Sequence, residues 1–171
     1  SFIYVHYSNA AVSALKEDGS AWCWGLNRNG ELGDFTKTNR SSPVSVVGNH
    51  SFIYICTGRD HTVALKADGS AWCWGDGILG QLGNNSKASQ SSPVSVVGNH
   101  SFIKISARDL FTVALKEDGS IWCWGYNSSG GKLGNGHILS RSSPVSLLGD
   151  HSFVDIFPIS YPEDGTIAKK A

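Results

Sequence analysis

The sequence of 171 residues lacks several features that mark common protein classes. It has no methionine, and its 14 basic and 14 acidic side chains leave no net charge. Proteins that bind nucleic acids or anionic membranes carry a positive surface, so we expect neither kind of partner. No apolar run approaches the ~20 residues of a membrane-spanning helix, and no basic-then-apolar leader opens the chain. Both a secreted and a cytoplasmic location stay open.

Glycine and tryptophan are abundant instead, with 20 and 6 residues, and the chain repeats itself. The tripeptide Ser1-Phe2-Ile3 recurs at residues 51–53 and 101–103 and, as Ser-Phe-Val, at 152–154. More than half of the first fifty positions are identical in the next fifty. A fixed period of this kind is the signature of a repeat architecture. We therefore divide the chain into units 1–50, 51–100 and 101–151 and a degenerate partial repeat, 152–171.

Each unit is expected to form four short strands joined by turns. In the second unit these are 51–55, 61–66, 70–75 and 92–98, which are apolar or alternate between apolar and polar residues. An Asp-Gly dipeptide separates the second and third strands, and such a dipeptide between alternating strands predicts a hairpin with a type I′ turn. The hairpin tips are Asp18-Gly19, Asp68-Gly69 and Asp118-Gly119. No segment has a helical period.

Four antiparallel strands in every ~50 residues favour a β-propeller, in which each unit is one blade. Alternation places Trp72 and Trp74 on one face of their strand and Ala71 and Cys73 on the other. A blade with one bulky and one small face can stack on the next blade at native packing density. We therefore expect the paired tryptophans of every unit to be mostly buried against the Ala/Cys face of an adjacent blade.

These residues resemble a known family. The Trp-Cys-Trp-Gly strand is followed by Gly30-Glu31-Leu32-Gly33 in the first unit and by Gly80-Gln81-Leu82-Gly83 in the second. With the Gly58-Arg59-Asp60-His61 segment and the Pro-Val strand, this order is similar to the repeat of the regulator of chromosome condensation family. The resemblance implies an all-β, seven-bladed propeller. The Gly-x-x-His segment is intact only in the second unit.

Three units and a partial one fill about half of such a ring. An open row of blades would expose apolar faces and sheet edges. We expect either that this is a fragment of a longer propeller chain, or that a second copy closes the ring as a homo-oligomer, a dimer that joins unlike ends. In the partial repeat, 152–157 keeps the first-strand pattern. Pro158 and Pro162 follow, so 158–171 is expected to fray or to cap an edge.

No arrangement of residues indicates catalysis, a metal or a cofactor. Ser, His and Asp occur at positions that repeat with the framework, and they form no catalytic Ser-His-Asp set distinct from that framework. Three of the four cysteines share one repeat position and should lie farther apart than the ~7 Å that a disulfide allows. We expect all four thiols to be reduced. His50, His100 and His151 are interpreted as turn residues, with a ring of metal ligands as the alternative, and His61 as a packed or hydrogen-bonded residue.

Differences between the units are concentrated in two loops, near 6–11 and 26–40 of the first unit and their equivalents. Loops on a rigid scaffold often carry binding residues, and aromatic and Arg side chains anchor interfaces. Neutral drift of unconstrained loops would give the same distribution. The candidate binding residues are Phe35, Arg59, Asp60, Ile78, Leu79, Arg108, Asp109, Tyr126, Ile138 and Leu139.

The sequence thus predicts a non-enzymatic interaction scaffold whose loop face binds a protein or a glycan. The family resemblance implies two alternatives. One is guanine-nucleotide exchange on a small GTPase, which needs an inserted wedge, whereas no unit carries an insertion longer than one residue. The other is a secreted inhibitor of an enzyme, because a similar propeller blocks β-lactamases.

Overall fold

The structure is a computed structural model that describes residues 1–149, 152–157 and 167–170. In this part of the chain all regular structure is β-strand, and no helix could span a membrane. Three four-stranded antiparallel sheets follow one another along the chain, as predicted. The first contains β1 (Phe2–Tyr7), β2 (Ala11–Lys16), β3 (Ala21–Gly25) and β4 (Arg40–Ser45); the second β5 (Tyr54–Thr57), β6 (His61–Leu65), β7 (Ala71–Gly75) and β8 (Gln90–Ser95); the third β9 (Lys104–Arg108), β10 (Phe111–Leu115), β11 (Ile121–Gly125) and β12 (Arg141–Ser146).

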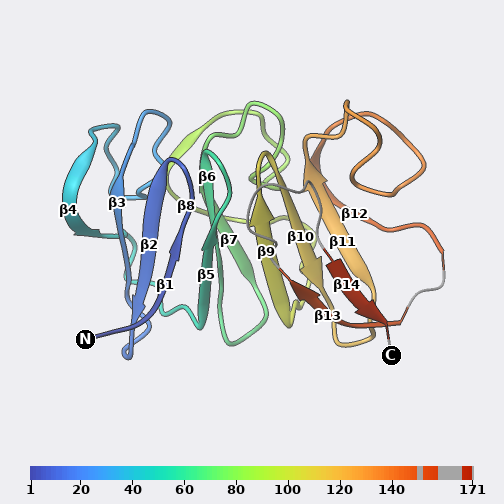
Figure 1. Cartoon of the computed structure of the whole chain (residues 1–171), viewed down its shortest axis with the longest axis horizontal. Coiled ribbons are helices and arrows are strands. Elements are labelled where there is room, and N and C mark those ends of the chain that lie inside the picture. The colour runs from blue at the N-terminus through green and yellow to red at the C-terminus, as the bar shows by residue number, and fades with distance from the viewer. Residues whose placement is uncertain (150–151, 158–166, 171) are drawn as a thin grey trace.

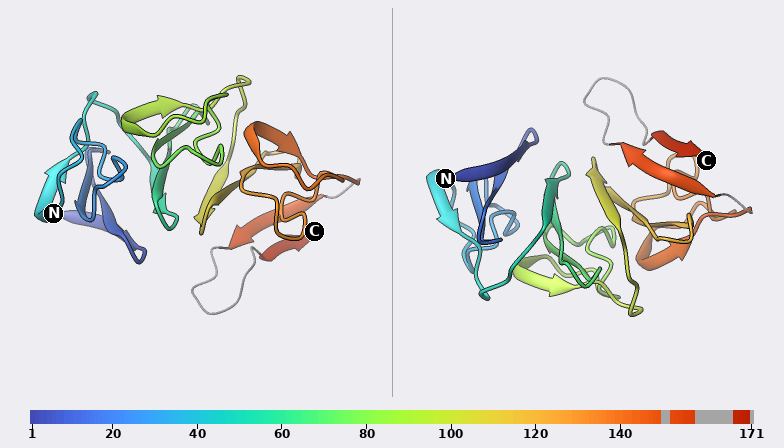
Figure 2. Two further views of the ribbon diagram at one scale, coloured as in Figure 1. Left: turned by 90° about the horizontal axis from the view of Figure 1, so that it is seen from above. Right: turned by 90° about the horizontal axis from the view of Figure 1, so that it is seen from below.

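The sheets stand side by side as blades of an incomplete propeller (Figure 1). Within each sheet the strands follow in chain order, so each blade is a simple meander. Viewed along the blades, the first strands β1, β5 and β9 lie on the inner side of an arc and the fourth strands on its outer side (Figure 2). We refer to the three sheets as blades 1, 2 and 3.

The hairpin tips lie at the predicted Asp-Gly dipeptides, but the type of turn differs. Of the turn residues, only the glycines have a positive φ, +79° at Gly19, +80° at Gly69 and +81° at Gly119. Gly19 N–H donates to the Lys16 carbonyl, and Lys16 N–H donates to the Ser20 carbonyl. This is a three-residue loop with a left-handed glycine rather than a type I′ turn. The Asp18 carboxylate accepts the Ser20 N–H at 2.9 Å, which favours the observed form.

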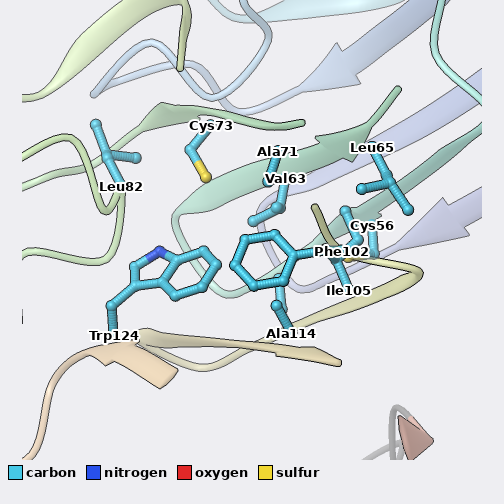
Figure 3. Packing of buried hydrophobic residues seen from close by; sticks show 11 residues of the cluster. Cys56, Val63, Leu65, Ala71, Cys73, Leu82, Phe102, Ile105, Ala114 and Trp124 are labelled. Carbon is cyan, nitrogen blue, oxygen red and sulfur yellow. The ribbon is translucent and has the colours of Figure 1, made fainter. Parts of the chain in front are cut away.

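Adjacent blades are held together by bulky side chains that pack on small ones. Trp74, Phe52 and Ile55 of blade 2 form one buried cluster with residues of blade 1 that include Ala21 and Cys23. Trp124 and Phe102 of blade 3 pack in the same way against Ala71 and Cys73 of blade 2 (Figure 3). Trp74 and Trp124 are fully buried, while Trp22, Trp24, Trp72 and Trp122 are only partly exposed. The predicted stacking of bulky on small faces is confirmed for blades 2 and 3, but it does not hold for Trp22 and Trp24 of blade 1, which belong to no cluster with another blade in the described chain.

The partial repeat forms more structure than the sequence predicted. Strand β13 (Phe153–Phe157) occupies the expected first-strand position and packs against β9 and β10. We expected 158–171 to fray or to cap an edge; β14 (Ile167–Lys170) does not fray but pairs antiparallel with the open edge of β13. Proline excludes strand pairing only at its own position, so a segment beyond Pro158 and Pro162 can still use the open edge of β13. The rest of that prediction lies outside the described residues.

Candidate functional site

The loops that join first to second and third to fourth strands lie at one end of all three blades. The Asp-Gly hairpins lie at the other end (Figure 1). We call the first end the loop face; it consists of residues 8–10, 26–39, 58–60, 76–89, 109–110 and 126–140. Nine of the ten predicted binding residues lie in these loops, and the tenth, Arg108, ends β9 beside them. The structure therefore brings all the predicted residues to one face.

Large apolar side chains project from the third-to-fourth-strand loop of every blade. Phe35 in blade 1, Ile78 in blade 2, and Ile138 and Leu139 in blade 3 are each at least 60% exposed. Leu79 and Tyr126 are half-buried and contribute less surface. Contiguous exposed apolar patches mark interaction sites, whereas single exposed apolar residues are ordinary, so it is their common location at one end of three blades that makes these side chains candidates.

Phe35 combines exposure with an unusual backbone. Its φ is +65°, in the left-handed region that bulky residues rarely occupy. The equivalent positions in the other blades are Asn85 (φ +60°) and Gly136 (φ +75°), residue types that adopt this conformation readily. The N–H of Phe35 donates to the Ser91 carbonyl of blade 2 at 2.8 Å, which fixes the conformation. Such strain is often stored at functional sites.

A buried polar side chain organises each of these long loops. In blade 1 the Asn27 side chain accepts the Leu32 N–H at 3.0 Å and donates to the carbonyls of Thr36 and Thr38. Asn127 does the same in blade 3, where it accepts the Leu133 N–H at 2.9 Å. In blade 2 Asp76 has the same role, because its carboxylate accepts hydrogen bonds from N–H and O–H groups of its own loop. The exposed apolar tips are therefore carried by internally bonded loops.

Sequence reasoning missed these organisers. The available signal was a polar residue that recurs one or two places after the Trp-Cys-Trp-Gly strand, within loops that otherwise vary.

The charged candidates form a cluster of their own between blades 2 and 3. Arg59 Nε lies 2.8 Å from Asp60 Oδ2, and Arg59 Nη1 lies 3.5 Å from Asp109 Oδ1. The Arg59 N–H also donates to the Asp109 carbonyl at 2.8 Å. The hydrogen bond to Asp60 is the main cause that raises the pKa of Arg59. These three residues thus bind one another and link two loops, while Arg108 is half-buried nearby.

Blades 2 and 3 also each donate hydrogen bonds to a backbone carbonyl in the long loop of the preceding blade. The Glu31 carbonyl accepts Trp74 Nε1–H and Thr62 Oγ1–H, both at 2.9 Å. The Gln81 carbonyl accepts Trp124 Nε1–H at 3.0 Å and Thr112 Oγ1–H at 3.2 Å. These buried bonds fix the loop of one blade against the sheet of the next.

His61 is a structural residue of the same interface, as predicted. Thr112 gives its hydroxyl proton to the Gln81 carbonyl, so His61 Nε2–H donates to Thr112 Oγ1 at 3.0 Å. Its Nδ1 has no partner within the described chain. Burial lowers the pKa of His61 to about 4, which keeps the ring neutral near pH 7.

The thiols are also packed, and so are two of the predicted turn histidines, His50 and His100. All four cysteines are unpaired and buried, and burial raises the pKa of Cys56 and of Cys123 to about 12. A thiol with such a pKa is a poor nucleophile. His50 packs against Trp72 and His100 against Trp122, with tilted rings whose centroids lie 4.3 and 4.2 Å apart. His151 lies outside the described residues, among which no three His, Cys, Asp or Glu residues form a metal-binding group.

Comparison with known structures shows the same fold. Human WBSCR16 is 22% identical with a TM-score of 0.76, over 91% of this chain and 42% of that one. Prp20p from Saccharomyces cerevisiae is 18% identical with a TM-score of 0.80, over 98% and 44%. The ectodomain of the Physcomitrella patens receptor kinase CR4 is 18% identical with a TM-score of 0.56, over 91% and 34%. This chain thus spans less than half the length of these relatives.

Sequence comparison identifies the repeat itself. None of the curated proteins matches the sequence significantly. The family model of the regulator of chromosome condensation (RCC1) repeat matches residues 18–65 and 68–115, together more than half of the chain. A second model of the same repeat matches 52–81 and 102–130. The matched segments include the tryptophan strands of all three blades, and the chain belongs to the family of regulator of chromosome condensation (RCC1) repeats.

Proposed function

We propose that this chain is a non-enzymatic binding module whose loop face holds a protein partner. One observation carries the proposal: four large apolar side chains, each at least 60% exposed, project from loops at the same end of three blades. Burying such side chains stabilises a complex by roughly 25 cal/mol for every Å² removed from water. The anchors would be Phe35, Ile78, Ile138 and Leu139.

The internal bonding of the loops supports this proposal. Asn27, Asp76 and Asn127 hold the loops from within, so little conformational freedom is left to lose when a partner binds. Three of the four exposed side chains are aliphatic. Because sugar hydroxyls must keep hydrogen-bond partners when they are buried, an aliphatic surface favours a protein over a glycan.

Relatives of the same fold support a protein partner too. The yeast structure of Prp20p is described together with its binding to Gsp1p and histones, and a further structure has Kap60 bound to yeast RCC1 (Prp20). Those partners belong to that protein. For nucleotide exchange, this chain lacks an obvious inserted wedge, since its units differ in length by one residue at most. For enzyme inhibition, no residue selects a target.

The test replaces each of the four anchors by the residue that another blade has at the same repeat position. The four-site variant carries Phe35→Asn, Ile78→Arg, Ile138→Lys and Leu139→Thr; the residues at these positions in other blades are Asn85, Arg28, Lys87 and Thr38, respectively. Ala67→Lys, exposed at the opposite end, is the control for added charge. The wild type and both variants are immobilised, and the proteins that each captures from a lysate are compared by quantitative mass spectrometry. The partner that the wild type retains most strongly is then purified and titrated against all three.

We expect at least one partner that the Ala67→Lys variant binds as the wild type does. The four-site variant should bind this partner at least about tenfold more weakly, a loss of about 1.4 kcal/mol in binding free energy. Equal retention of every partner by the variant would contradict a binding site at the loop face. Release of nucleotide from a purified small GTPase, measured with the same proteins, would show exchange activity instead.

A further inference from the structure

The basic and acidic side chains of the loop face differ in what they contact. Three basic side chains are exposed and form no ion pair within the described chain: Arg28, Lys37 and Lys87. Two come from the long loop of blade 1 and one from that of blade 2. Because guanidinium and ammonium groups only donate hydrogen bonds, each of them can still bind an acceptor on a partner.

Every carboxylate of the same loops is already bound within the chain. Three have almost no exposed surface and accept hydrogen bonds from their own loop, namely Glu31, Asp34 and Asp76. The other two, Asp60 and Asp109, both pair with Arg59. A partner that reaches this face therefore finds cations that lack an acceptor and no carboxylate that lacks a donor.

The hairpin end of the blades has the opposite character. The Asp-Gly hairpins carry five exposed carboxylates, those of Glu17, Asp18, Asp68, Glu117 and Asp118. The lysines of these hairpins are half-buried, and the Nζ atom of each lies over a tryptophan ring of its own blade: Lys16, Lys66 and Lys116. The absence of net charge on the chain thus conceals one end with exposed carboxylates and another with exposed cations.

The exposed cations occupy the same two loop positions as apolar anchors. Ile78 stands at the repeat position of Arg28, and Ile138 stands at that of Lys37 and Lys87. Since the blades share one fold, equivalent positions lie at the same end of each blade. At these two positions blade 1 presents two cations, blade 2 one cation and one isoleucine, and blade 3 an isoleucine. Cationic and apolar side chains therefore belong to one surface.

The aliphatic anchors favour an acidic protein over a nucleic acid. Nucleic acids are held by many contacts from Lys and Arg to phosphates, and single strands also stack their bases on aromatic rings. Three exposed cations and one aromatic anchor, Phe35, offer little of either. Carboxylates that lie beside apolar side chains on a protein match both kinds of group, because charge-assisted hydrogen bonds to Lys and Arg are strong.

We propose that the partner of the loop face is an acidic protein surface, on which carboxylates lie beside apolar side chains. This inference rests on the proposed function and names the chemistry of the partner. The carboxylates pair with Arg28, Lys37 and Lys87, while the apolar side chains cover the anchors. A purely apolar surface would desolvate these three cations without giving them an acceptor, so the same residues select against it.

Peptides of random sequence displayed on phage are the probe, selected on the immobilised chain. The three-site variant carries Arg28→Gln, Lys37→Gln and Lys87→Gln. Its control carries Asn49→Asp, Ala67→Glu and Asn99→Asp, which give the same net charge at exposed positions outside the loop face. A separate anchor variant without added charge carries Phe35→Asn and Ile78→Ser, the residue types of Asn85 and Ser128 at these repeat positions.

Peptides enriched on the wild type should contain an excess of both carboxylate and apolar side chains. The most enriched peptide is synthesised and titrated in ~0.1 M salt, where the three-site variant should bind at least about fivefold more weakly than the wild type. The control variant should bind as the wild type does. In ~1 M salt, where the screening length falls from ~10 to ~3 Å, the difference should shrink.

Failure of this inference and failure of the proposed function give different results. Enriched peptides without excess carboxylates, or equal binding by the wild type and the three-site variant, would overturn the acidic partner but leave the loop face as a binding site. No enrichment, or undiminished binding by the anchor variant, would contradict both proposals. Random single-stranded DNA that binds the wild type but not the three-site variant would assign the cations to a nucleic acid and overturn the inference.

Discussion

The indole N–H of Trp74 donates a hydrogen bond to the backbone carbonyl of Glu31 across 2.9 Å, from one blade to the loop of another. Thr62 donates to the same oxygen. Both lone pairs of a buried carbonyl are thus used by the neighbouring blade, and the same pair of bonds recurs at Gln81. The packing of the tryptophan and the placement of the loop depend on each other.

Replacing Trp74 by Phe should therefore destabilise the fold. The change removes one buried hydrogen bond and leaves a small cavity, which together cost about 1–3 kcal/mol in the free energy of unfolding. Trp72→Phe is the matched control, because that indole is half-exposed and its N–H donates to Ser70 of the same blade, just before the strand begins. Urea titrations of both variants check the difference; equal losses would show that the bond to Glu31 contributes nothing.

Enlarging the small face should be harmful as well. Cys73 is fully buried and belongs to the cluster with Trp124 and Phe102. Cys73→Leu would overpack this interface and lower the free energy of unfolding by about 1–3 kcal/mol. Cys73→Ala, which removes volume at the same site, separates overpacking from loss of the thiol. A melting temperature for Cys73→Leu equal to that of the wild type would contradict the tight fit between blades.

Phe35→Asn should stabilise the chain while it removes a proposed binding anchor. Asparagine adopts the left-handed conformation more readily than phenylalanine, so the strain of the +65° φ is relieved by about 1 kcal/mol. The reciprocal change Asn85→Phe should lower stability by a similar amount. Thermal unfolding measures the change in melting temperature of each variant, which should be positive for Phe35→Asn and negative for Asn85→Phe. A lower melting temperature for Phe35→Asn would show that the phenyl ring contributes to the stability of the fold.

Stability should fall as the pH is lowered through the range in which His61 titrates. Its folded pKa of about 4 lies below the ordinary value of 6.5, so the unfolded chain takes up the proton first. The contribution of the neutral ring is fully present above pH ~6.5 and is lost towards pH ~4, by roughly 3 kcal/mol in total.

His61→Gln isolates this effect, because glutamine can still donate to Thr112 but does not titrate. Urea unfolding between pH ~4.5 and ~7 should show a weaker pH dependence in the variant. The other histidines with lowered pKa values, His6, His50 and His100, contribute equally to both proteins. Identical pH profiles would mean that His61 is not buried as described.

The blades were predictable from the sequence because the alternation of side chains along a strand and the need for glycine in a tight turn are both local properties. Trp72 and Trp74 lie two residues apart, which fixes their common face, and Gly69 identifies the hairpin whatever its turn type. The Glu31 carbonyl was not predictable, since every residue has one. The pairing of Arg59 with Asp109 depends on how two blades meet. The strain at Phe35 could have been found by aligning the units, because Asn85 and Gly136 stand at its position.

The two attachments of the first long loop to blade 2 use backbone atoms, the carbonyl of Glu31 and the N–H of Phe35. A backbone group is present whichever side chain its residue carries. Mutation at the tip can thus change the exposed surface of the loop while the attachment persists. A duplicated fifty-residue unit already contains the backbone groups of this attachment, so later substitutions can alter the exposed tip alone.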